Sequence, residues 1–530
     1  AAHQCRRVAI GQQPVVADGS VTLGRRRIEQ VVGHLEESFS CPLTLRRTVD
    51  GERRLVEGVS ASDRRGTAWA MRSSRFVSGV ASGDPSTTSV VLWGRVDGPG
   101  PVEWSIADID ADAVAASGTV RPDDRGVVSV EIEGLRPGRE FRYGFTDGDD
   151  HSPEGCTRTL AAAAVTLRLG VACCARLPSG PFTGYRALAD ADLDLVVHLG
   201  DYIYEDGGGG VRGAHDPPHE CVTSDDYDRR YAQYRSDPDL QALHAAAPWV
   251  STLDDHEIEG NAVRFASSQH PHRTQNVVDP ERRRAGVGAH TRWMPQRSHG
   301  NGPSQRDRHL AVGDLCDLVM VDTRLGGREQ QVRSDGPATK PPVSQSPQLL
   351  SDEQWEWLEH IVDGSTASWL LLATQVQVAP LRLGWLPARN RHRRWPVRIA
   401  PLINPDQWDG YPSERQRLLD LLDRHDRDDV VILSGDLHGR FATTIRRAGR
   451  PSIAEVTTPS ISAPTFASTL DTRLPIPSSW TARWIKAIHP HIEHLDLAHH
   501  GATVADISHD VIRFHDAVRP DAWSWSLRRR

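Results

Sequence analysis

The chain has 530 residues, of which 38% are hydrophobic and 25% are charged, as is usual for a folded globular protein. Its length corresponds to about two to four domains. A formal net charge of −8 at pH 7 argues against a general binder of nucleic acid or of anionic membranes. No apolar run approaches the length of a membrane-spanning helix, so the sequence predicts no transmembrane segment.

Residues 1–75 are rich in arginine, glutamate and small polar residues, and their weak periodicity predicts a loosely attached or partly disordered appendage. They hold no apolar signal core, and neither Arg6-Arg7 nor the arginines at 25–27 precede one, so no signal peptide is visible. Seven cysteines stand at irregular spacings, and this odd number argues against a disulfide framework. The sequence alone therefore leaves the compartment open.

Residues 76–163 carry short strand patterns that are separated by turns. Strands are expected at 89–93, 102–106, 127–132 and 141–145, and the glycine and proline residues at 134–138 predict a turn before the last of them. Short strands at such regular intervals are typical of a β-sandwich. We therefore expect a small N-terminal β-sandwich that ends near residue 163.

After the alanine-rich linker at 161–164, apolar strands alternate with helical patterns. A strand at 166–172, a helix around 184–190 and a strand at 193–199 make one βαβ unit. Further buried strands are expected at 249–253, 315–321, 369–373, 430–433 and 453–456, and helices at 352–363 and 414–424. This alternation indicates an α/β fold. Residues 260–310 are polar and lack clear periodicity, which predicts an irregular lid or a disordered loop.

Potential metal ligands follow several of these strands, and functional groups gather at the carboxyl ends of strands in open α/β sheets. The clusters are Cys173-Cys174, Asp201 with Tyr204, Asp254-Asp255-His256-Glu257, and Asp436 with His438. Asp436 and His438 stand two apart, so in an extended segment they project to the same face. Asp201 and Tyr204 stand three apart, which places them on one side of a turn. A carboxylate and a phenolate together suit a hard trivalent cation such as iron(III).

Each cluster taken alone has a simpler explanation. An acidic residue or histidine at a strand end is more often a cap or a hydrogen-bonded core group than a metal ligand. A cysteine pair such as Cys173-Cys174 is more often a pair of small apolar side chains buried in the core than a pair of metal ligands. The Asp-Asp-His-Glu segment is equally consistent with an exposed charged loop. Four such clusters at the same kind of strand end are harder to explain separately. Together they favour a dinuclear metal site.

These motifs, in this order, resemble the PhoD-like alkaline phosphatase and phosphodiesterase family of calcineurin-like metallophosphoesterases. The resemblance runs from Phe76 to about residue 515, and its further motifs are Gly79-Val80-Ala81-Ser82-Gly83-Asp84-Pro85, Leu92-Trp93-Gly94-Arg95, Val321-Asp322-Thr323-Arg324, Trp408-Asp409-Gly410-Tyr411-Pro412 and Pro459-Ser460-Ile461-Ser462. It implies a metallophosphoesterase-type α/β sandwich preceded by a small N-terminal β-sandwich domain. The implied boundaries are 76–163 for the N-terminal domain, 164–515 for the catalytic domain and 516–530 for a C-terminal tail.

The resemblance also implies a function: a hydrolase that cleaves phosphate esters with a metal-activated hydroxide at a dinuclear site. The implied ligands are Cys174, Asp201, Tyr204 and His438 for iron(III), and the bridging Asp201 with Asp255, Asn261 and Asp436 for calcium(II). Thiolate, phenolate and imidazole suit a trivalent transition metal, whereas carboxylate and amide oxygens suit calcium. His256 and Asp255 are the implied catalytic residues, with His256 placed to protonate the leaving oxygen. Members of this family are commonly exported.

A few positions depart from the family pattern. Cys173 stands where serine is typical, and Ala175 replaces a common polar residue. Gly260 removes one possible oxygen ligand, so Asn261 would serve alone. Gln375 is a weaker candidate for a further polar ligand. These departures leave a non-catalytic homologue that binds metal or phosphate as the alternative function.

Arg324 and Arg176 are candidate contacts to the substrate phosphate, and a structural ion pair is the alternative for each. Members of the family act on phosphomonoesters, phosphodiesters or cell-wall phosphate polymers, and nothing in the sequence selects among these phosphate-ester substrates. The sequence does not predict the oligomeric state.

Overall fold

The computed structural model describes residues 75–260, 262–263, 266–267, 279–298, 300–329, 347–381, 406–473 and 477–529. The appendage expected at residues 1–75 lies outside the described residues, apart from Arg75. Residues 73–530 form one compact unit. None of the helices in the described ranges is long and apolar enough to cross a membrane.

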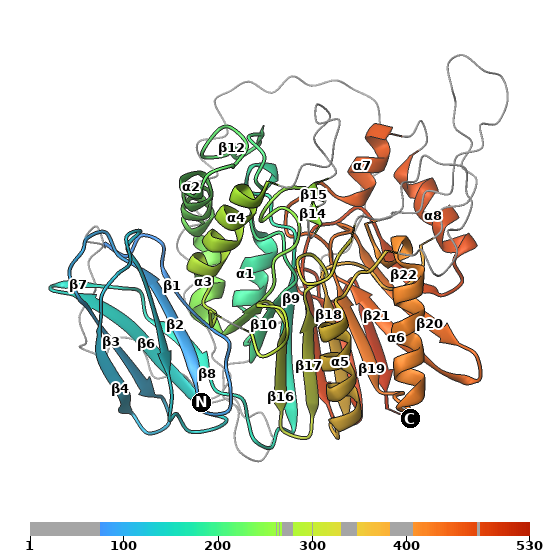
Figure 1. The fold of residues 1–530 in the computed structure, drawn as a ribbon, viewed down its shortest axis with the longest axis horizontal. Helices are drawn as coiled ribbons and strands as arrows, with labels where there is room; N and C mark the ends of the chain where they lie inside the picture. The colour runs from blue at the N-terminus through green and yellow to red at the C-terminus, as the bar shows by residue number, and fades with distance from the viewer. Residues whose placement is uncertain are drawn as a thin grey trace, which may run out of the picture. The chain divides into compact units, whose positions relative to one another are not determined.

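Two large sheets dominate this unit (Figure 1). The nine-stranded sheet has the order β25-β24-β23-β9-β10-β13-β1-β2-β5. Its strands are β1 (Val80–Gly83), β2 (Val90–Arg95), β5 (Val127–Ile132), β9 (Thr166–Ala172), β10 (Leu195–His198), β13 (Trp249–Ser251), β23 (Thr503–Ser508), β24 (Val511–Asp516) and β25 (Ser524–Arg528). Strands β9, β10, β13 and β1 run parallel to one another, so their carboxyl ends lie at one edge of the sheet.

The second sheet has seven strands in the order β16-β17-β18-β19-β21-β20-β22. They are β16 (Arg308–Val312), β17 (Cys316–Val321), β18 (Trp369–Thr374), β19 (Val430–Ser434), β20 (Arg440–Arg447), β21 (Arg450–Thr457) and β22 (Ile492–Asp496). Strands β17, β18, β19 and β21 are parallel. All residues of β17, β18 and β19 are buried, as expected for parallel strands that are covered on both faces.

Helices pack against both sheets. They are α1 (Thr183–Ala189), α2 (Ser224–Arg235), α3 (Pro238–Ala246), α4 (Pro280–Trp293), α5 (Asp352–Gly364), α6 (Pro412–Arg424), α7 (Phe466–Arg473) and α8 (Ser478–Ile488), with the 3-10 helices η2 (Leu177–Ser179) and η4 (Trp408–Gly410). Along β9 and β10, Leu169 and Val197 pack with residues of the second sheet, whereas Val196 packs with helices α1 to α4. On the other side, Leu370 packs with α5 and α6. The layers are therefore helix, sheet, sheet and helix, which confirms the expected α/β sandwich.

A third sheet forms the N-terminal β-rich region. It has the order β4-β3-β6-β7, and β8 also pairs with β6. Its strands are β3 (Val102–Asp108), β4 (Ala113–Val120), β6 (Glu140–Asp147), β7 (Asp150–His151) and β8 (Gly155–Arg158), and the remaining short strands of the chain are β11 (Gly209–Gly210), β12 (Gly213–Ala214), β14 (Ala262–Val263) and β15 (Ala266–Ser267). Phe141 and Phe145 of this sheet pack against Val80 and Leu92, so the region is a sandwich with β1, β2 and β5.

The N-terminal sandwich shares one of its two sheets with the rest of the unit. Gly83 of β1 pairs with Trp249 of β13 in parallel register. A Cβ at position 83 would lie 2.7 Å from the Trp249 carbonyl oxygen and 2.0 Å from that of Pro295, so only glycine permits this approach. The sheet is continuous across the boundary expected near residue 163, and the boundaries at 163 and 515 stay predictions.

Residues 260–310 differ from the expected irregular segment, because they contain α4 and β16. The side chain of Asp279 caps α4 by accepting from the N–H groups of Glu281 and Arg282, and Pro280 follows it. The buried face of α4 has helical spacing, and its members are Arg282, Ala285, Gly286, Ala289, His290 and Trp293. Most of them are small or polar, so the pattern lacks apolar periodicity. The prediction of a lid or disordered loop is wrong for this helix.

Residues 516–530, expected as a tail, contribute β25 to the edge of the nine-stranded sheet. Phe514 of β24 pairs with Trp525, and the ladder runs from Val511 opposite Arg528 to His515 opposite Ser524. No residue of β25 is buried, so its sequence lacks the apolar run by which the other strands were predicted.

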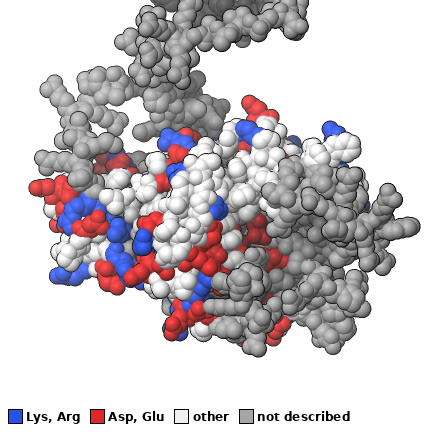
Figure 2. All heavy atoms as spheres, turned by 90° about the horizontal axis from the view of Figure 1, so that it is seen from above, with Lys and Arg blue, Asp and Glu red and all other residues white. Residues whose placement is uncertain are grey.

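Arginine supplies nearly all the positive charge, because Lys340 and Lys486 are the only lysines. On the face shown in Figure 2, arginine and acidic side chains are interspersed over the described surface. Exposed ion pairs of the described chain include Arg424 with Glu359 (2.8 Å) and Arg186 with Asp190 (3.1 Å). Exposed pairs of this kind contribute little to stability.

The layer order predicts where substitution is costly. Val431 of β19 is 1% exposed and packs between the two large sheets, whereas Val114 of β4 is 66% exposed. We expect Val431→Ala to lower the free energy of unfolding by about 2 kcal/mol, because it removes buried methyl groups and leaves a cavity. Val114→Ala, the matched control, should change it by less than about 0.5 kcal/mol. Urea unfolding measures both, and equal losses would contradict the layer assignment.

Candidate metal centre

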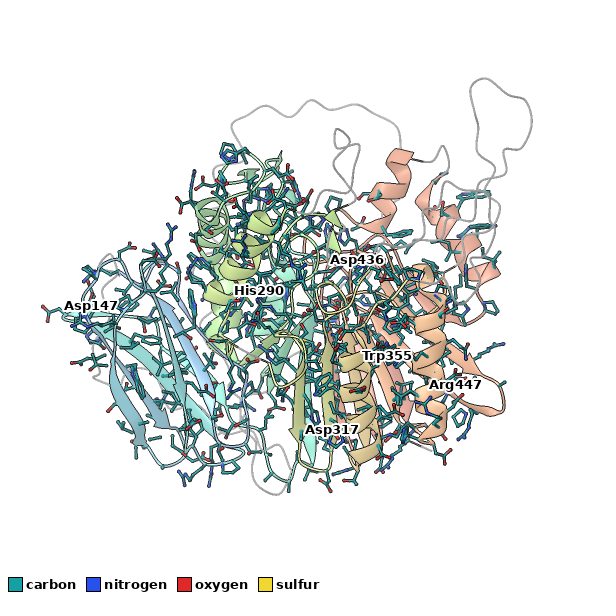
Figure 3. All side chains as sticks on the ribbon, viewed as in Figure 1. Asp147, His290, Asp317, Trp355, Asp436 and Arg447 are labelled. Atoms are coloured by element: carbon teal, nitrogen blue, oxygen red, sulfur yellow. The ribbon has the colours of Figure 1, made fainter. Side chains whose placement is uncertain are left out.

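The predicted ligands lie at the carboxyl ends of strands from both large sheets. Cys174 follows β9, Asp201 follows β10 and Asp255 follows β13, all in the nine-stranded sheet. Asp436 and His438 follow β19 of the second sheet. Figure 3 shows Asp436 beyond the ends of the strands, on the side away from the labelled Asp317. The two sheets therefore bring their loops to one place.

The donor atoms form three overlapping groups. Within each group they all lie within 4.8 Å of one another, and the groups are Cys174, Asp201 and His438; Asp201, Asp255 and His256; and Asp201, Asp254, Asp255 and Asp436. The Tyr204 hydroxyl donates to Asp201 Oδ2 at 2.8 Å and lies 3.1 Å from Nε2 of His438. Asp201 belongs to every group, which is the geometry that a residue bridging two cations requires.

The backbone of several predicted ligands is in the left-handed region. The φ angle is 59° at Cys174, 54° at Asp201, 61° at Asp436 and 53° at His438. In the described chain, eight non-glycine residues have positive φ, and the other four are all aspartates. For a non-glycine residue this conformation costs about 1–3 kcal/mol, and such strain clusters at functional sites. The strain is an indication of a functional site that is independent of the side chains.

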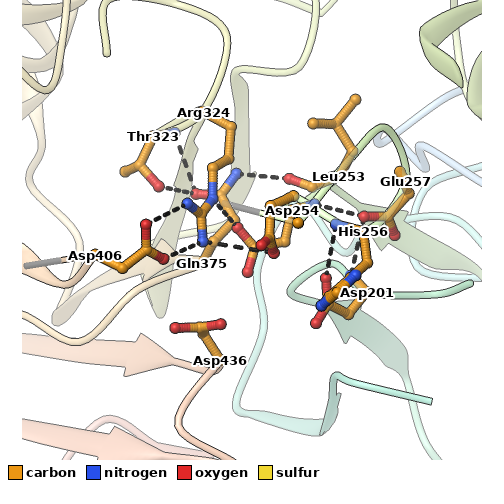
Figure 4. Close-up of polar contacts among 12 residues, drawn as sticks. Asp201, Leu253, Asp254, His256, Glu257, Thr323, Arg324, Gln375, Asp406 and Asp436 are labelled. Carbon is orange, nitrogen blue, oxygen red and sulfur yellow. Dashed lines mark hydrogen bonds and ion pairs between the residues drawn. The ribbon is translucent and has the colours of Figure 1, made fainter. Parts of the chain in front are cut away.

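Glu257 holds two of the ligand loops together. Its buried carboxylate accepts from the backbone N–H groups of Asp201 (3.1 Å), Tyr202 (2.6 Å) and Asp254 (2.7 Å). The loop after β10 and the loop after β13 thus share one acceptor, as Figure 4 shows for Asp201 and Glu257. Gly200 permits this close approach, since a Cβ there would lie 2.4 Å from Cβ of Asp254.

The charges of the cluster show whether cations fit. Burial raises the pKa of Asp254 to about 8 and that of Asp436 to about 7, and it raises the pKa of Asp201 well above its usual range. Burial likewise raises the pKa of the Cys174 thiol and the Tyr204 phenol. Bound cations favour the ionised form of each of these groups. A donor set of sulfur, phenolic, imidazole and carboxylate groups that lacks positive charge therefore fits a pair of metal ions.

His256 and Glu205 form a pair beside the ligand groups. Nδ1 of His256 lies 2.7 Å from Oε2 of Glu205, and the other oxygen of Glu205 accepts from the N–H of Gly260 at 2.8 Å. The His256 ring stacks on the Tyr204 ring with centroids 4.1 Å apart. Burial alone lowers the pKa of His256, but the carboxylates of Glu205, Asp255 and Asp201 raise it well above its usual value. The contact orients the imidazole and fixes a proton on Nδ1.

Sequence reasoning gave Glu205 no role and counted Glu257 only among the potential metal ligands. Glu205 follows Tyr204 directly, and Glu257 ends the Asp-Asp-His-Glu motif, so both stood inside predicted motifs. Their nearness to the predicted ligands along the chain was the only indication of a role that the sequence offered. The groups that Glu205 and Glu257 contact depend on how two loops pack together, which the sequence does not show.

Arg324 lies in the site but is occupied by carboxylates. It is 0% exposed, bonds the Asp254 carboxylate, and donates to both oxygens of Asp406 at 2.9 and 2.7 Å (Figure 4). Arg176 makes a similar two-point contact with Asp206, at 3.0 and 2.8 Å. For both arginines this geometry favours the structural ion pair over a contact with substrate phosphate.

The remaining candidates are distributed as follows. Asn261 lies outside the described residues. The thiol of Cys173 lies near the carbonyl oxygens of Thr458 (3.8 Å) and Pro459 (3.9 Å), and Cys174 is the cysteine that joins a ligand group. The amide of Gln375 accepts from Thr323 N–H at 3.1 Å and donates to the carbonyl of Leu253 at 3.0 Å. These bonds make Gln375 a connector between loops, not a ligand in this geometry.

Comparison with known proteins gives the family. The model for PhoD-like phosphatases matches residues 169–515, and the model for their N-terminal domain matches residues 60–161. Alkaline phosphatase D of Bacillus subtilis (strain 168) is 37% identical over 402 residues, which cover 70% of this chain and 65% of that protein. The chain thus matches just under two thirds of the length of this curated relative.

A solved structure supports the same assignment. The structure described as PhoD superposes with a TM-score of 0.71 at 31% sequence identity, and the match covers 86% of this chain and 90% of that chain. Family models account for most of the sequence, and the fold and the order of the motifs agree with them. The chain belongs to the PhoD-like phosphatase family.

Proposed function

We propose that this chain is a metal-dependent phosphatase or phosphodiesterase that hydrolyses phosphate esters. The observation that carries the proposal is the position of Asp201, which lies within 4.8 Å of donor atoms in three groups of potential ligands. Membership of the PhoD-like phosphatase family and the similarity to an alkaline phosphatase D support it.

The donor chemistry supports a division of the site between two metals. Cys174, Tyr204 and His438 would hold iron(III) together with Asp201, because thiolate, phenolate and imidazole suit a trivalent transition metal. Asp201, Asp255 and Asp436 would hold calcium(II), with Asn261 as a further ligand. When bound, the two cations supply an activated water and neutralise charge on the phosphoryl oxygens.

His256 and Glu205 supply the proton transfer in this proposal. Nδ1 of His256 donates to the buried carboxylate of Glu205, and the raised pKa favours the imidazolium form, in which Nε2 also carries a proton and can give it to the departing oxygen of the ester. The His256 side chain is 28% exposed, so a substrate can reach the ring. Glu205 acts as a positioning residue, because it fixes the orientation and the protonated nitrogen of the imidazole.

The altered positions do not favour the non-catalytic alternative. Ala175 takes part through its backbone, since its N–H donates to the carbonyl of Asp201 at 2.9 Å. Gly260 likewise uses its N–H, which donates to Glu205. Both contacts are possible for any non-proline residue, so the substitutions leave these described contacts intact.

The first test is removal of metal. We expect the purified protein to contain iron and calcium by elemental analysis and to hydrolyse p-nitrophenyl phosphate or its bis-ester. A strong chelator should abolish this activity, because no remaining group activates water or neutralises the phosphoryl charge. Adding iron and calcium back should restore it. Full activity after the metals have been removed would contradict the proposal.

Colour gives a readout of iron that does not depend on activity. A tyrosinate bound to iron(III) absorbs visible light, so the loaded protein should be purple or brown. Tyr204→Phe should remove this absorption band. Tyr202→Phe changes a nearby tyrosine that is not a proposed iron ligand, so this control variant should keep the band. Loss of colour in both variants, or in neither, would remove Tyr204 from the iron ligands.

The shared carboxylate can be tested by a nearly isosteric change. Asp201→Asn replaces a charged bridge by a neutral amide, so we expect hydrolysis to fall by several orders of magnitude and the metal content to decrease. Circular dichroism should show an unchanged fold. Asp190→Asn, whose parent side chain is 61% exposed, is the matched control and should leave the rate unchanged. If Asp201→Asn retains its activity, Asp201 does not bridge two metals.

The role of His256 predicts a dependence on the leaving group. His256→Ala should slow esters with poor leaving groups more than esters with good ones, because only the former need a proton in the transition state. Glu205→Gln should give the same selectivity with a smaller loss, since it disturbs the imidazole without removing it. Rates over a series of substituted phenyl phosphates measure both. Equal losses over the series would remove His256 from the role of acid.

A further inference from the structure

A buried arginine lies away from the ligand groups, at the junction of α2 with the N-terminal sandwich. Arg235 is the last residue of α2, and its side chain is 0% exposed. Its guanidinium carbon lies 4.0 Å from the centroid of the Trp93 ring on β2. None of its three side-chain nitrogens makes a hydrogen bond of ordinary geometry among the described residues, although the Tyr202 phenol lies close enough to interact with it. Such a group is costly to bury without a counter-charge.

Other polar atoms near Arg235 are also buried and without a hydrogen bond in the described structure. They are Oγ of Ser82 on β1, the hydroxyl of Tyr143 on β6 and Nδ1 of His244 on α3. Arg235 acts electrostatically on Tyr143 and His244, and the hydroxyls of Ser82 and Tyr143 lie close enough for a weak interaction with each other, so these side chains adjoin one another. Unpaired buried polar groups are rare in native proteins, and several at one place indicate a bound group that pairs them.

The groups around Arg235 do not supply the missing negative charge. The ionisable groups that act on it are the phenols of Tyr202 and Tyr143, and no carboxylate is among them. The ordinary pKa of a tyrosine phenol is about 10, and burial raises the pKa of Tyr143 further. Both phenols are therefore neutral near pH 7. Arg235 keeps its proton at this pH, so the junction carries a net positive charge.

The unpaired groups are mainly hydrogen-bond donors. Arg235 offers N–H groups only, and the hydroxyls of Ser82 and Tyr143 can each donate. The Tyr202 hydroxyl lies 2.9 Å from Nε2 of His244, and when it donates to that nitrogen, Nδ1 carries the proton of the neutral ring. Water would satisfy these donors but would leave the charge of Arg235 uncompensated. An anion satisfies both requirements.

We propose that Arg235 binds a small monovalent anion of the chloride class, enclosed by Tyr143, Ser82 and His244. The occupant is small because every side chain that faces it is buried. The site would join β1 and β6 of the N-terminal sandwich to α2 and α3. Through Tyr202 it would also support the loop that carries Asp201 and Tyr204, since Tyr202 lies between them and its hydroxyl contacts His244.

Bromide identifies the occupant directly. Crystals of the full chain grown with bromide in place of chloride should show an anomalous peak in contact with the guanidinium of Arg235 and the hydroxyl of Tyr143. Ordered water without an anomalous peak at this position would overturn the proposal, and so would a junction in which protein groups alone pair Arg235.

Thermal unfolding tests the site in solution. At constant ionic strength, with chloride replaced by the bulky anion gluconate, chloride should raise the unfolding midpoint of the wild type by about 2 °C or more and then saturate. Arg235→Met should remove this dependence. In gluconate the variant should be at least as stable as the wild type, because it removes a buried charge that has no counter-ion. If Arg235 had a purely structural role, Arg235→Met would lower the unfolding midpoint in both buffers, and this result would overturn the proposal.

The chain offers a matched control for this substitution. Arg440 is also buried, and its guanidinium carbon lies 4.9 Å from the centroid of the Trp523 ring, but it donates to Asp516 at 2.7 Å. Arg440→Met should therefore lower the midpoint in both buffers and keep the response to chloride. Tyr143→Phe keeps the charge of Arg235 and removes one donor, so it should raise the half-saturating chloride concentration by about tenfold. An unchanged chloride response in both Arg235→Met and Tyr143→Phe would exclude the site.

Discussion

Repulsion among buried carboxylates is the constraint on which the centre depends. Asp201, Asp254, Asp255 and Asp436 have oxygens within 4.8 Å of one another, and each close pair of ionised groups costs about 3–4 kcal/mol at an effective dielectric constant near 20. Arg324 relieves part of this repulsion, since it bonds Asp254 and Asp406. Its guanidinium also lies 3.6 Å from Oδ1 of Asp255, but one positive charge does not balance this many carboxylates. Bound cations would pair with the negative charge that remains, so the site favours metal over a neutral, protonated state.

The fold supplies the rigidity that such a cluster needs. Left-handed backbone at Cys174, Asp201, Asp436 and His438 is unfavourable, and it persists only where the surroundings determine it. Glu257 fixes two of the loops through backbone N–H groups, and the N–H of Cys174 donates to the carbonyl of Gly200 at 3.2 Å. Because these bonds join groups of the protein itself, they hold the ligands near their positions independently of a cation. Preorganisation of this kind reduces the free-energy cost of binding.

The sequence predicted most of the parallel strands of the two large sheets and the polar residues that end them, because apolar runs such as Val430–Leu433 end abruptly in polar groups. It did not predict several antiparallel strands, such as β16, β20 and β23. It predicted poorly where a helix has a polar buried face and where a strand is exposed. Helix α4 was missed because Arg282 and His290 lie on its buried face, and β25 was missed because no residue of it is buried. For Arg324 the sequence left substrate contact and ion pairing open. That choice depends on Asp406, which is far away in the chain and adjacent only in the folded protein.

Other buried arginines among the described residues have acceptors within the protein, and Arg235 differs from them. Arg324 and Arg440 pair with carboxylates, and Arg230 pairs with backbone carbonyls, including that of Pro217 at 2.8 Å. In each case the acceptor lies within the protein, so hydrogen bonds to it offset the free-energy cost of burying the charge. Arg235 has the same burial and a stacked tryptophan, yet it has neither kind of acceptor in the described structure. Since the cation–π contact is worth at most about 2 kcal/mol and leaves the N–H groups unpaired, an external anion is the simplest way for this arginine to meet the requirement that the others meet internally.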